Sequence, residues 1–115
     1  MEKGRPWGKY EQFLDSELGT IKLVYIKKGE RISLQMHKTR DEFWKVLSGH
    51  PKIYLGHPGN IESIKASVGD EFFIPKNTAH QAEATNGKVL LLAISYGYFY
   101  PDDKIRIEDK QGRQN

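Results

Sequence analysis

Several segments of this chain alternate hydrophobic and polar residues with a period of two, which is the pattern of half-buried β-strands, while residues 20–27 are apolar on both faces like a central strand. The alternating segments are short and are bounded by Gly, Pro or Asn, the residues that favour turns. No segment longer than about ten residues keeps the 3.6-residue period of a helix. The pattern predicts an all-β protein of about nine strands, at residues 7–14, 20–27, 31–37, 42–47, 51–55, 61–68, 69–74, 79–85 and 88–95.

One turn and the two ends of the chain complete the expected organisation. The chain has 115 residues, enough for one hydrophobic core, so we expect a single domain over residues 1–115. Asn86-Gly87 is a strong hairpin signal that would pair the last two strands. Residues 1–6 are expected to form a loose arm, and residues 110–115 a frayed polar tail.

Three side chains with metal-binding donor atoms lie on two successive predicted strands. Gln35 and His37 are two residues apart and therefore share one face of their strand. Glu42 begins the next strand after a short break. If its face meets the face of Gln35 and His37, an amide oxygen, an imidazole and a carboxylate converge.

A fourth donor, His80, follows a tight turn in the second half of the chain. Pro75 closes the strand before it because proline cannot donate a backbone hydrogen bond, and Asn77 favours a turn. A histidine just after such a turn is held rigidly, as a metal ligand must be. The four donors predict a site for one divalent metal, with zinc expected first and manganese, iron, cobalt or nickel as alternatives. The competing interpretation is that the histidines are only hydrogen-bonded.

Composition excludes several classes of chemistry and partner. The chain has no cysteine, which excludes thiolate catalysis, cysteine-based zinc sites and disulfides. Its net charge is +3, but the Lys and Arg residues are scattered and no nucleic-acid-binding motif accompanies them. An anionic small molecule is therefore a better partner than nucleic acid. No apolar run approaches membrane-spanning length and no secretory signal is apparent, so we expect a cytoplasmic protein without a membrane partner.

The two donor segments resemble the two sequence motifs of the cupin superfamily. The matching positions are Gly29, Gln35, His37, Glu42 and Gly49 in the first motif, and Gly69, Pro75 and His80 in the second. Three positions depart from the motifs, namely Gln35, Asn77 and Ala84, where histidine, glycine and asparagine are usual. The resemblance implies an all-β cupin jelly-roll barrel, a double-stranded β-helix.

The flanking segments narrow this resemblance to one family. Residues 5–8, 33–37 and 95–98, with Arg106 and further residues of the C-terminal tail, resemble the C-terminal cupin domain of type II mannose-6-phosphate isomerases. That family is known for a Gln-His-Glu-His metal set, which makes Gln35, His37, Glu42 and His80 the implied ligands. The guanylyltransferase domain that often precedes this domain is absent from the sequence, so nucleotide transfer is not expected.

The resemblance implies a metal-dependent isomerase that interconverts mannose 6-phosphate and fructose 6-phosphate through a cis-enediol. Basic residues near the predicted ligands are the candidates for binding the phosphate, namely Arg40, Lys76 and Arg106. The proton-transfer group is left open among Lys45, Asp41 and Glu71.

Two other functions and one partner are also compatible with the sequence. A non-catalytic, metal-containing cupin could bind a sugar phosphate or another small metabolite. An iron-dependent dioxygenase is a third possibility, but Gln35 argues against it because such sites are usually histidine-rich. We also expect a homodimer, with an aromatic cluster as its contact, formed by Tyr96, Tyr98, Phe99 and Tyr100.

Overall fold

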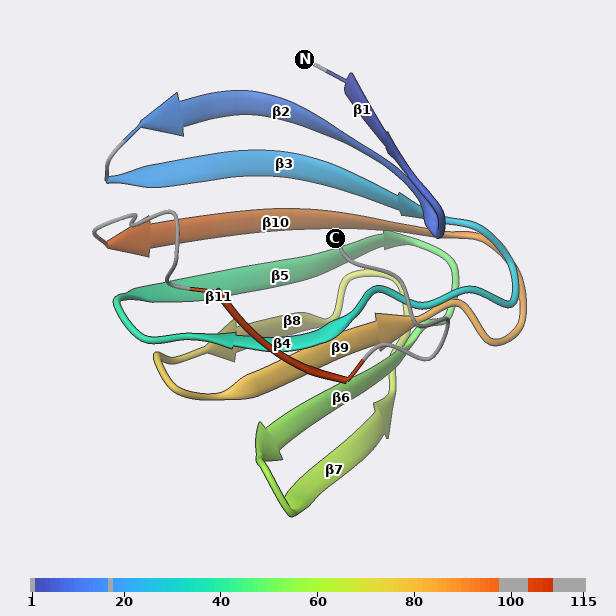
Figure 1. Cartoon of the computed structure of the whole chain (residues 1–115). Helices are drawn as coiled ribbons and strands as arrows, with labels where there is room; N and C mark the ends of the chain where they lie inside the picture. Colours follow the sequence, from blue (N-terminus) through green and yellow to red (C-terminus); the bar gives the residue numbers. More distant parts are fainter. Residues whose placement is uncertain (1, 17, 98–103, 109–115) are drawn as a thin grey trace.

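The structure is a computed structural model of the chain, and it describes residues 2–16, 18–97 and 104–108. The described residues form eleven β-strands and no helix. The strands make two antiparallel sheets that face each other (Figure 1). The all-β prediction is confirmed. Because the described residues include no helix, none of them forms a helix that could cross a membrane.

The larger sheet supplies most of the inner wall of the protein. Its six strands lie in the order β1 (Glu2–Arg5), β2 (Gly8–Ser16), β3 (Gly19–Ile26), β10 (Val89–Gly97), β5 (Arg40–Ser48) and β8 (Glu71–Ile74). The smaller sheet lies across from it (Figure 1). Its five strands lie in the order β11 (Lys104–Glu108), β4 (Leu34–His37), β9 (Ala79–Glu83), β6 (Lys52–His57) and β7 (Asn60–Lys65).

The core lies between the two sheets, because strand alternation sends every second side chain inward. On β5 the inward residues Trp44 and Val46 are buried, and Leu91 on β10 packs in the same cluster. Ile53 contributes from the opposite sheet and is fully buried. Burying one such branched or aromatic side chain stabilises the fold by about 1.5–3 kcal/mol.

The structure corrects three of the expected boundaries. The predicted arm contains β1, whose residues Glu2–Arg5 pair with β2. Its polar sequence gives no hydrophobic alternation, so only the pairing reveals it. A further strand, β11, pairs with β4 and was not predicted, although its sequence Lys-Ile-Arg-Ile-Glu does alternate. The strand predicted at residues 31–37 begins only at Leu34, which leaves Ile32 in the core cluster rather than on a regular strand face.

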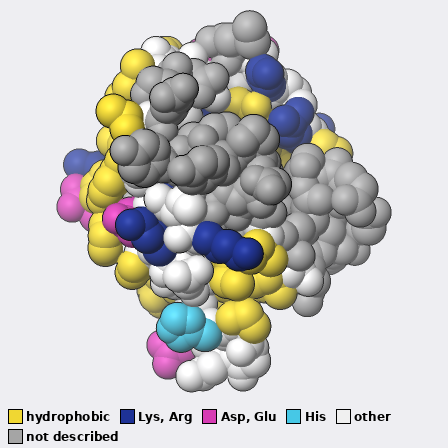
Figure 2. Space-filling model, turned by 60° about the vertical axis from the view of Figure 1, so that its left-hand side comes forward, with side chains coloured by type: hydrophobic (Ala, Val, Ile, Leu, Met, Phe, Trp, Pro, Cys, Tyr) yellow, Lys and Arg dark blue, Asp and Glu magenta, His cyan; other side chains and the backbone are white. Residues whose placement is uncertain are grey.

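The outer face of the larger sheet carries a row of apolar side chains. Ile94 on β10 stands opposite Ile21 on β3 and Phe43 on β5, and Phe43 in turn stands opposite Phe73 on β8. Tyr96 stacks on Phe73 with 6.5 Å between the ring centroids. Hydrophobic side chains also form a band along the left edge of the space-filling view (Figure 2). Of the predicted aromatic cluster only Tyr96 is described, since residues 98–100 lie outside the described residues, and the homodimer stays a prediction.

Candidate metal centre

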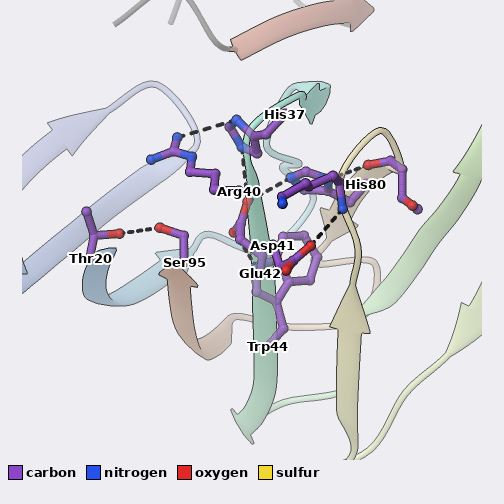
Figure 3. Close-up of polar contacts among 10 residues, drawn as sticks. Thr20, His37, Arg40, Asp41, Glu42, Trp44, His80 and Ser95 are labelled. Carbon is purple, nitrogen blue, oxygen red and sulfur yellow. Dashed lines mark hydrogen bonds and ion pairs between the residues drawn. The ribbon is translucent and has the colours of Figure 1, made fainter. Parts of the chain in front are cut away.

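Three of the four predicted ligands converge between the sheets. Glu42 Oε2 lies 3.0 Å from His37 Nε2 and 3.1 Å from His80 Nε2. The three donor atoms all lie within 4.8 Å of one another. Figure 3 shows the three side chains pointing toward one another from β4, β5 and β9. Both histidines are buried, and Glu42 is 13% exposed.

The local sequence explains why these side chains meet. His37 ends β4, and the chain turns back so that Glu42 enters β5 facing inward together with Trp44. The turn before His80 contains Asn77, which has a positive φ of 62°. The Asn77 N–H donates a hydrogen bond of 2.7 Å to the His37 carbonyl. This bond links the two predicted motifs and fixes the distance between their histidines.

Neighbouring groups orient two members of the cluster. The His80 Nδ1 atom lies 2.9 Å from the Thr78 carbonyl, so a neutral ring donates its Nδ1–H there and directs the Nε2 lone pair to the cluster. Trp44 Nε1 donates to the second oxygen of Glu42, Oε1, at 3.0 Å. The Trp44 ring also meets the His80 ring edge-on, with 5.4 Å between centroids. The Thr78 carbonyl in the turn before β9 and the Trp44 indole on β5 therefore orient the imidazole and the carboxylate.

The electrostatics of the cluster favour an ionised carboxylate. Burial by itself would raise the pKa of Glu42, but the adjacent His80 and His37 rings lower it well below its usual value. Burial lowers the pKa of His37, and contact with Glu42 only partly offsets this. Burial would also lower the pKa of His80, but the Glu42 carboxylate raises it above its usual value.

The donor set fits a divalent metal. Ligand atoms around an ion bound at about 2.0–2.2 Å lie roughly 3 Å apart, and the two Glu42 contacts measure 3.0 and 3.1 Å. The Thr78 carbonyl gives His80 the outer hydrogen bond that metal-bound histidines usually make. Two imidazoles and one carboxylate suit zinc and its first-row neighbours, so the cluster is a possible His/Glu metal site.

Gln35 lies near this set. It stands directly opposite His80 in the pairing of β4 with β9, so the two side chains share a face. Gln35 also lines the same cavity as the three-residue cluster. Gln35 and His37 therefore face the same cavity, as the alternation of their strand predicted.

A cavity of about 140 Å³ opens beside the cluster. One water needs about 10–15 Å³ of such volume, so the cavity can hold a small ligand or several waters. The wall opposite β4 and β9 is built by β1, β2, β3 and β10. It includes side chains that were not among the predicted site residues: Arg5, Trp7, Tyr10, Thr20, Lys22 and Ser95. Lys22, a charged residue within the largely apolar strand 20–27, was the one feature of the sequence that could have indicated this wall.

The predicted phosphate-binding residues fall in different places. Arg40 is buried, lines the cavity, and its Nη2 lies 3.4 Å from His37 Nδ1. Lys76 is exposed and does not line the cavity, and its backbone N–H donates to the Asp41 carboxylate at 2.9 Å. Arg106 belongs to β11, next to Gln35 in the backbone pairing, but its side chain lies outside the described residues.

The three proton-transfer candidates do not line the cavity. Lys45 Nζ and Glu71 Oε2 lie 3.5 Å apart in a surface ion pair on neighbouring strands. Asp41 alternates with the inward Glu42 and accepts the bond from the Lys76 backbone. Their side chains point away from the cluster because of strand alternation, which corrects the expectation that one of them could reach a ligand beside it.

Comparison with known proteins agrees with the sequence resemblance. The family model described as "Mannose-6-phosphate isomerase C-terminal" matches residues 1–109. Mannose-1-phosphate guanylyltransferase ManC of Salmonella typhimurium is 34% identical over 112 residues, which cover 95% of this chain and 22% of the relative. The chain thus spans about a fifth of the length of the curated relatives that it matches.

Solved structures confirm the expected fold. The capsular polysaccharide assembling protein CapF of Staphylococcus aureus superposes with a TM-score of 0.82 at 20% identity, over 95% of this chain and 34% of CapF. KdgF from Halomonas superposes with a TM-score of 0.74 at 19% identity, over 86% of this chain and 89% of KdgF. At these identities the likeness concerns the fold alone, which is the cupin jelly roll, a double-stranded β-helix.

Proposed function

The chain belongs to the mannose-6-phosphate isomerase C-terminal family, and on that premise we propose that it interconverts mannose 6-phosphate and fructose 6-phosphate with a divalent cation. The observation that carries the proposal is the convergence of His37, Glu42 and His80 beside a cavity. The family match covers the same residues, since it runs over positions 1–109. Guanylyl transfer is not proposed for this part, although the longer relatives carry that name.

Gln35, His37, Glu42 and His80 would hold the cation. A divalent cation in such a site acts as a Lewis acid that polarises a carbonyl and stabilises the charge developing on an enediolate. Glu42 is the only carboxylate of the set, so the protein ligands contribute a single negative charge. Zinc is the first candidate because it binds such nitrogen and oxygen donors more tightly than manganese or iron does.

The chain's own residues would orient the sugar and exclude water. The reaction moves a proton from C2 to C1, while the C2 hydroxyl becomes a carbonyl and the C1 carbonyl becomes a hydroxyl. Thr20 and Ser95 place a pair of hydroxyls on the inner face, where Ser95 stands directly opposite Glu42. They would donate to and accept from sugar hydroxyls. Trp44 and Leu91 supply apolar wall that keeps bulk water from the reacting carbons.

The test is isomerisation by the purified chain loaded with zinc. We expect mannose 6-phosphate and fructose 6-phosphate to interconvert, and deuterium at C2 of mannose 6-phosphate to move to C1 or exchange with water. His80→Ala should lose both metal and turnover. His57→Ala is the matched control, because His57 is exposed and lies outside the cavity. Full turnover by metal-free protein would overturn the proposal.

A non-catalytic metal-containing cupin is the second candidate. It is favoured by one observation, namely that Lys45, Asp41 and Glu71 all lie outside the cavity. Under this alternative the metal-loaded chain would bind mannose 6-phosphate without either turnover or deuterium loss. Calorimetric binding in the absence of isotope exchange would select it.

A further inference from the structure

Two cations from separate strands flank one aromatic ring in the cavity wall. Lys22 Nζ, from β3, lies 4.8 Å from the centroid of the Tyr10 ring. Arg5 Cζ, from the end of β1, lies 5.3 Å from the same centroid. Arg5 Nη2 also donates to the Tyr10 hydroxyl at 3.4 Å. All three side chains line the cavity that contains His37, Glu42 and His80.

The strand register fixes where these cations stand relative to the cluster. Lys22 is opposite Ala93, which is opposite Trp44, while Thr20 occupies the next inward row with Ser95 and Glu42. Lys22 is thus two strands and one inward row away from Glu42. With about 4.8 Å between strands and about 6.8 Å between alternate residues, their Cα atoms are roughly 12 Å apart. A ligand several ångströms long can touch the cluster and the lysine at once.

Placing two cations near one ring favours a bound anion. Like charges that approach in a partly buried place repel each other, and the ring faces only partly offset this. The Tyr10 contacts hold both cations in place before a ligand arrives, which reduces the entropy cost of binding. Guanidinium and ammonium groups are the side chains that bind phosphate oxygens best.

A buried donor beside these cations also points to a ligand. Trp7 lines the same cavity and is 6% exposed, and its indole Nε1 is buried without a hydrogen-bond partner among the described residues. Buried N–H groups are nearly always hydrogen-bonded. An oxygen of a ligand in the cavity would satisfy this one.

We propose that Arg5 and Lys22, held by Tyr10, bind the phosphate of the substrate while the opposite end of the sugar lies at the metal cluster. The inference rests on the proposed function for the identity of the sugar phosphate. A hexose 6-phosphate suits this geometry because its phosphate is at the far end of the carbon chain from C1 and C2. In the proposed binding mode the phosphate lies on the wall built by β1, β2 and β3, and not at the exposed Lys76.

The test measures binding to the metal-loaded whole chain by calorimetry, with mannose 6-phosphate and mannose as probes. Lys22→Met and Arg5→Gln should each weaken mannose 6-phosphate binding about tenfold or more, since each removes a charge-assisted hydrogen bond. Binding of mannose and metal content should not change. Lys22→Arg should retain most of the affinity because it keeps the charge. Added salt should weaken mannose 6-phosphate binding less in the variant that combines Lys22→Met with Arg5→Gln than in the parent.

Lys52→Met is the matched control. Lys52 Nζ also lies over a tyrosine ring, 5.6 Å from the Tyr54 centroid, but neither residue lines the cavity. This variant should bind mannose 6-phosphate as the parent does. Thermal melts of all variants separate loss of binding from loss of folding.

The outcomes separate this inference from the proposed function. Loss of binding in Lys22→Met without any turnover by the parent supports the phosphate site and rejects the isomerase. Turnover by the parent with an unchanged KM for mannose 6-phosphate in folded Lys22→Met and Arg5→Gln rejects the phosphate site alone. The phosphate site is also rejected if the parent binds mannose 6-phosphate no more tightly than mannose.

Discussion

Gln35 and His80 stand directly opposite each other as the pair that joins β4 to β9. Directly opposed residues of antiparallel strands direct their side chains to the same face, with Cβ atoms about 4.5–5.5 Å apart. The first donor of one sequence motif is thereby fixed beside the last donor of the other. A change at Gln35 therefore acts on the cluster itself.

Gln35→His should keep or tighten metal binding, because imidazole is a better ligand for these ions than a carboxamide. Isomerisation should nevertheless fall, since a stronger donor reduces the Lewis acidity of the ion. A displacement of about 1 Å in the site can cost on the order of a hundredfold in rate. Metal content and sugar-phosphate turnover are the two measurements. Equal turnover in the variant would mean that Gln35 is only a tolerated substitute for histidine.

Trp44→Phe should weaken metal binding about 10–100-fold, the usual effect of removing a group that orients a ligand. The variant loses the 3.0 Å hydrogen bond from the indole to Glu42 Oε1. A titration against a competing chelator measures the affinity. Trp7→Phe is the control, because it makes the same change in the same cavity at a tryptophan whose N–H has no described partner. Equal losses in both variants would assign the effect to packing.

The sequence predicted the strands that are delimited by turn residues, and it missed β1 and β11. Residues 20–27 and 88–95 are rich in β-forming residues and apolar on both faces, as expected for central strands, and they correspond to β3 and β10. Glu2–Arg5 is mostly charged, and it forms a strand because β2 offers a free edge. Lys104–Glu108 alternates, but over only five residues, and it pairs with β4. The edge of β2 that pairs with Glu2–Arg5 exists only in the folded sheet, so the local sequence of Glu2–Arg5 does not predict this strand.

The cluster was predictable because its members follow local rules. Alternation aligned Glu42 with the inward face of β5, and turn chemistry placed His80. Arg5 and Lys22 obey no such rule, since they meet only at Tyr10 after β1, β2 and β3 have paired. Two of the proton-transfer candidates, Asp41 and Lys45, lie an odd number of positions from Glu42 on β5, so strand alternation directs them outward. Glu71 on β8 stands opposite Lys45 and therefore shares its outward face.

Asn77→Val should destabilise the fold by about 1–2 kcal/mol, because a β-branched residue tolerates the left-handed region poorly. The positive φ of 62° explains why asparagine can replace the usual glycine here. Asn77→Gly should therefore change stability by less than about 0.5 kcal/mol. Urea denaturation measures both. Asn60→Val is the control at the first residue of β7, an asparagine outside the positive-φ region, and an equal loss there would contradict the explanation.

Tyr54 should make stability depend on pH in the alkaline range. Burial, followed by its 2.7 Å hydrogen bond to Glu83, raises the pKa of Tyr54 to about 12. The unfolded value is about 10, so the folded state holds the proton more tightly. This contribution is complete below about pH 10 and is lost as the pH rises toward about 12. The difference in unfolding free energy between the parent and Tyr54→Phe should shrink over that window, and a constant difference would contradict the assignment.

Thr20 and Ser95 should behave as one coupled pair. Their hydroxyl oxygens lie 2.6 Å apart in a buried contact on adjacent strands. Ser95→Ala or Thr20→Val should each cost about 1–3 kcal/mol, because each leaves the other hydroxyl without its partner. The double variant should lose less than the sum of the two by about 1 kcal/mol, as is common for contacting residues. Ser63→Ala, on the exposed strand β7, should cost less than about 0.5 kcal/mol. Urea denaturation of the parent, the two single variants and the double variant measures this coupling. Additive losses would mean that water in the cavity satisfies each hydroxyl separately, so the pair would then be free to rearrange around a sugar.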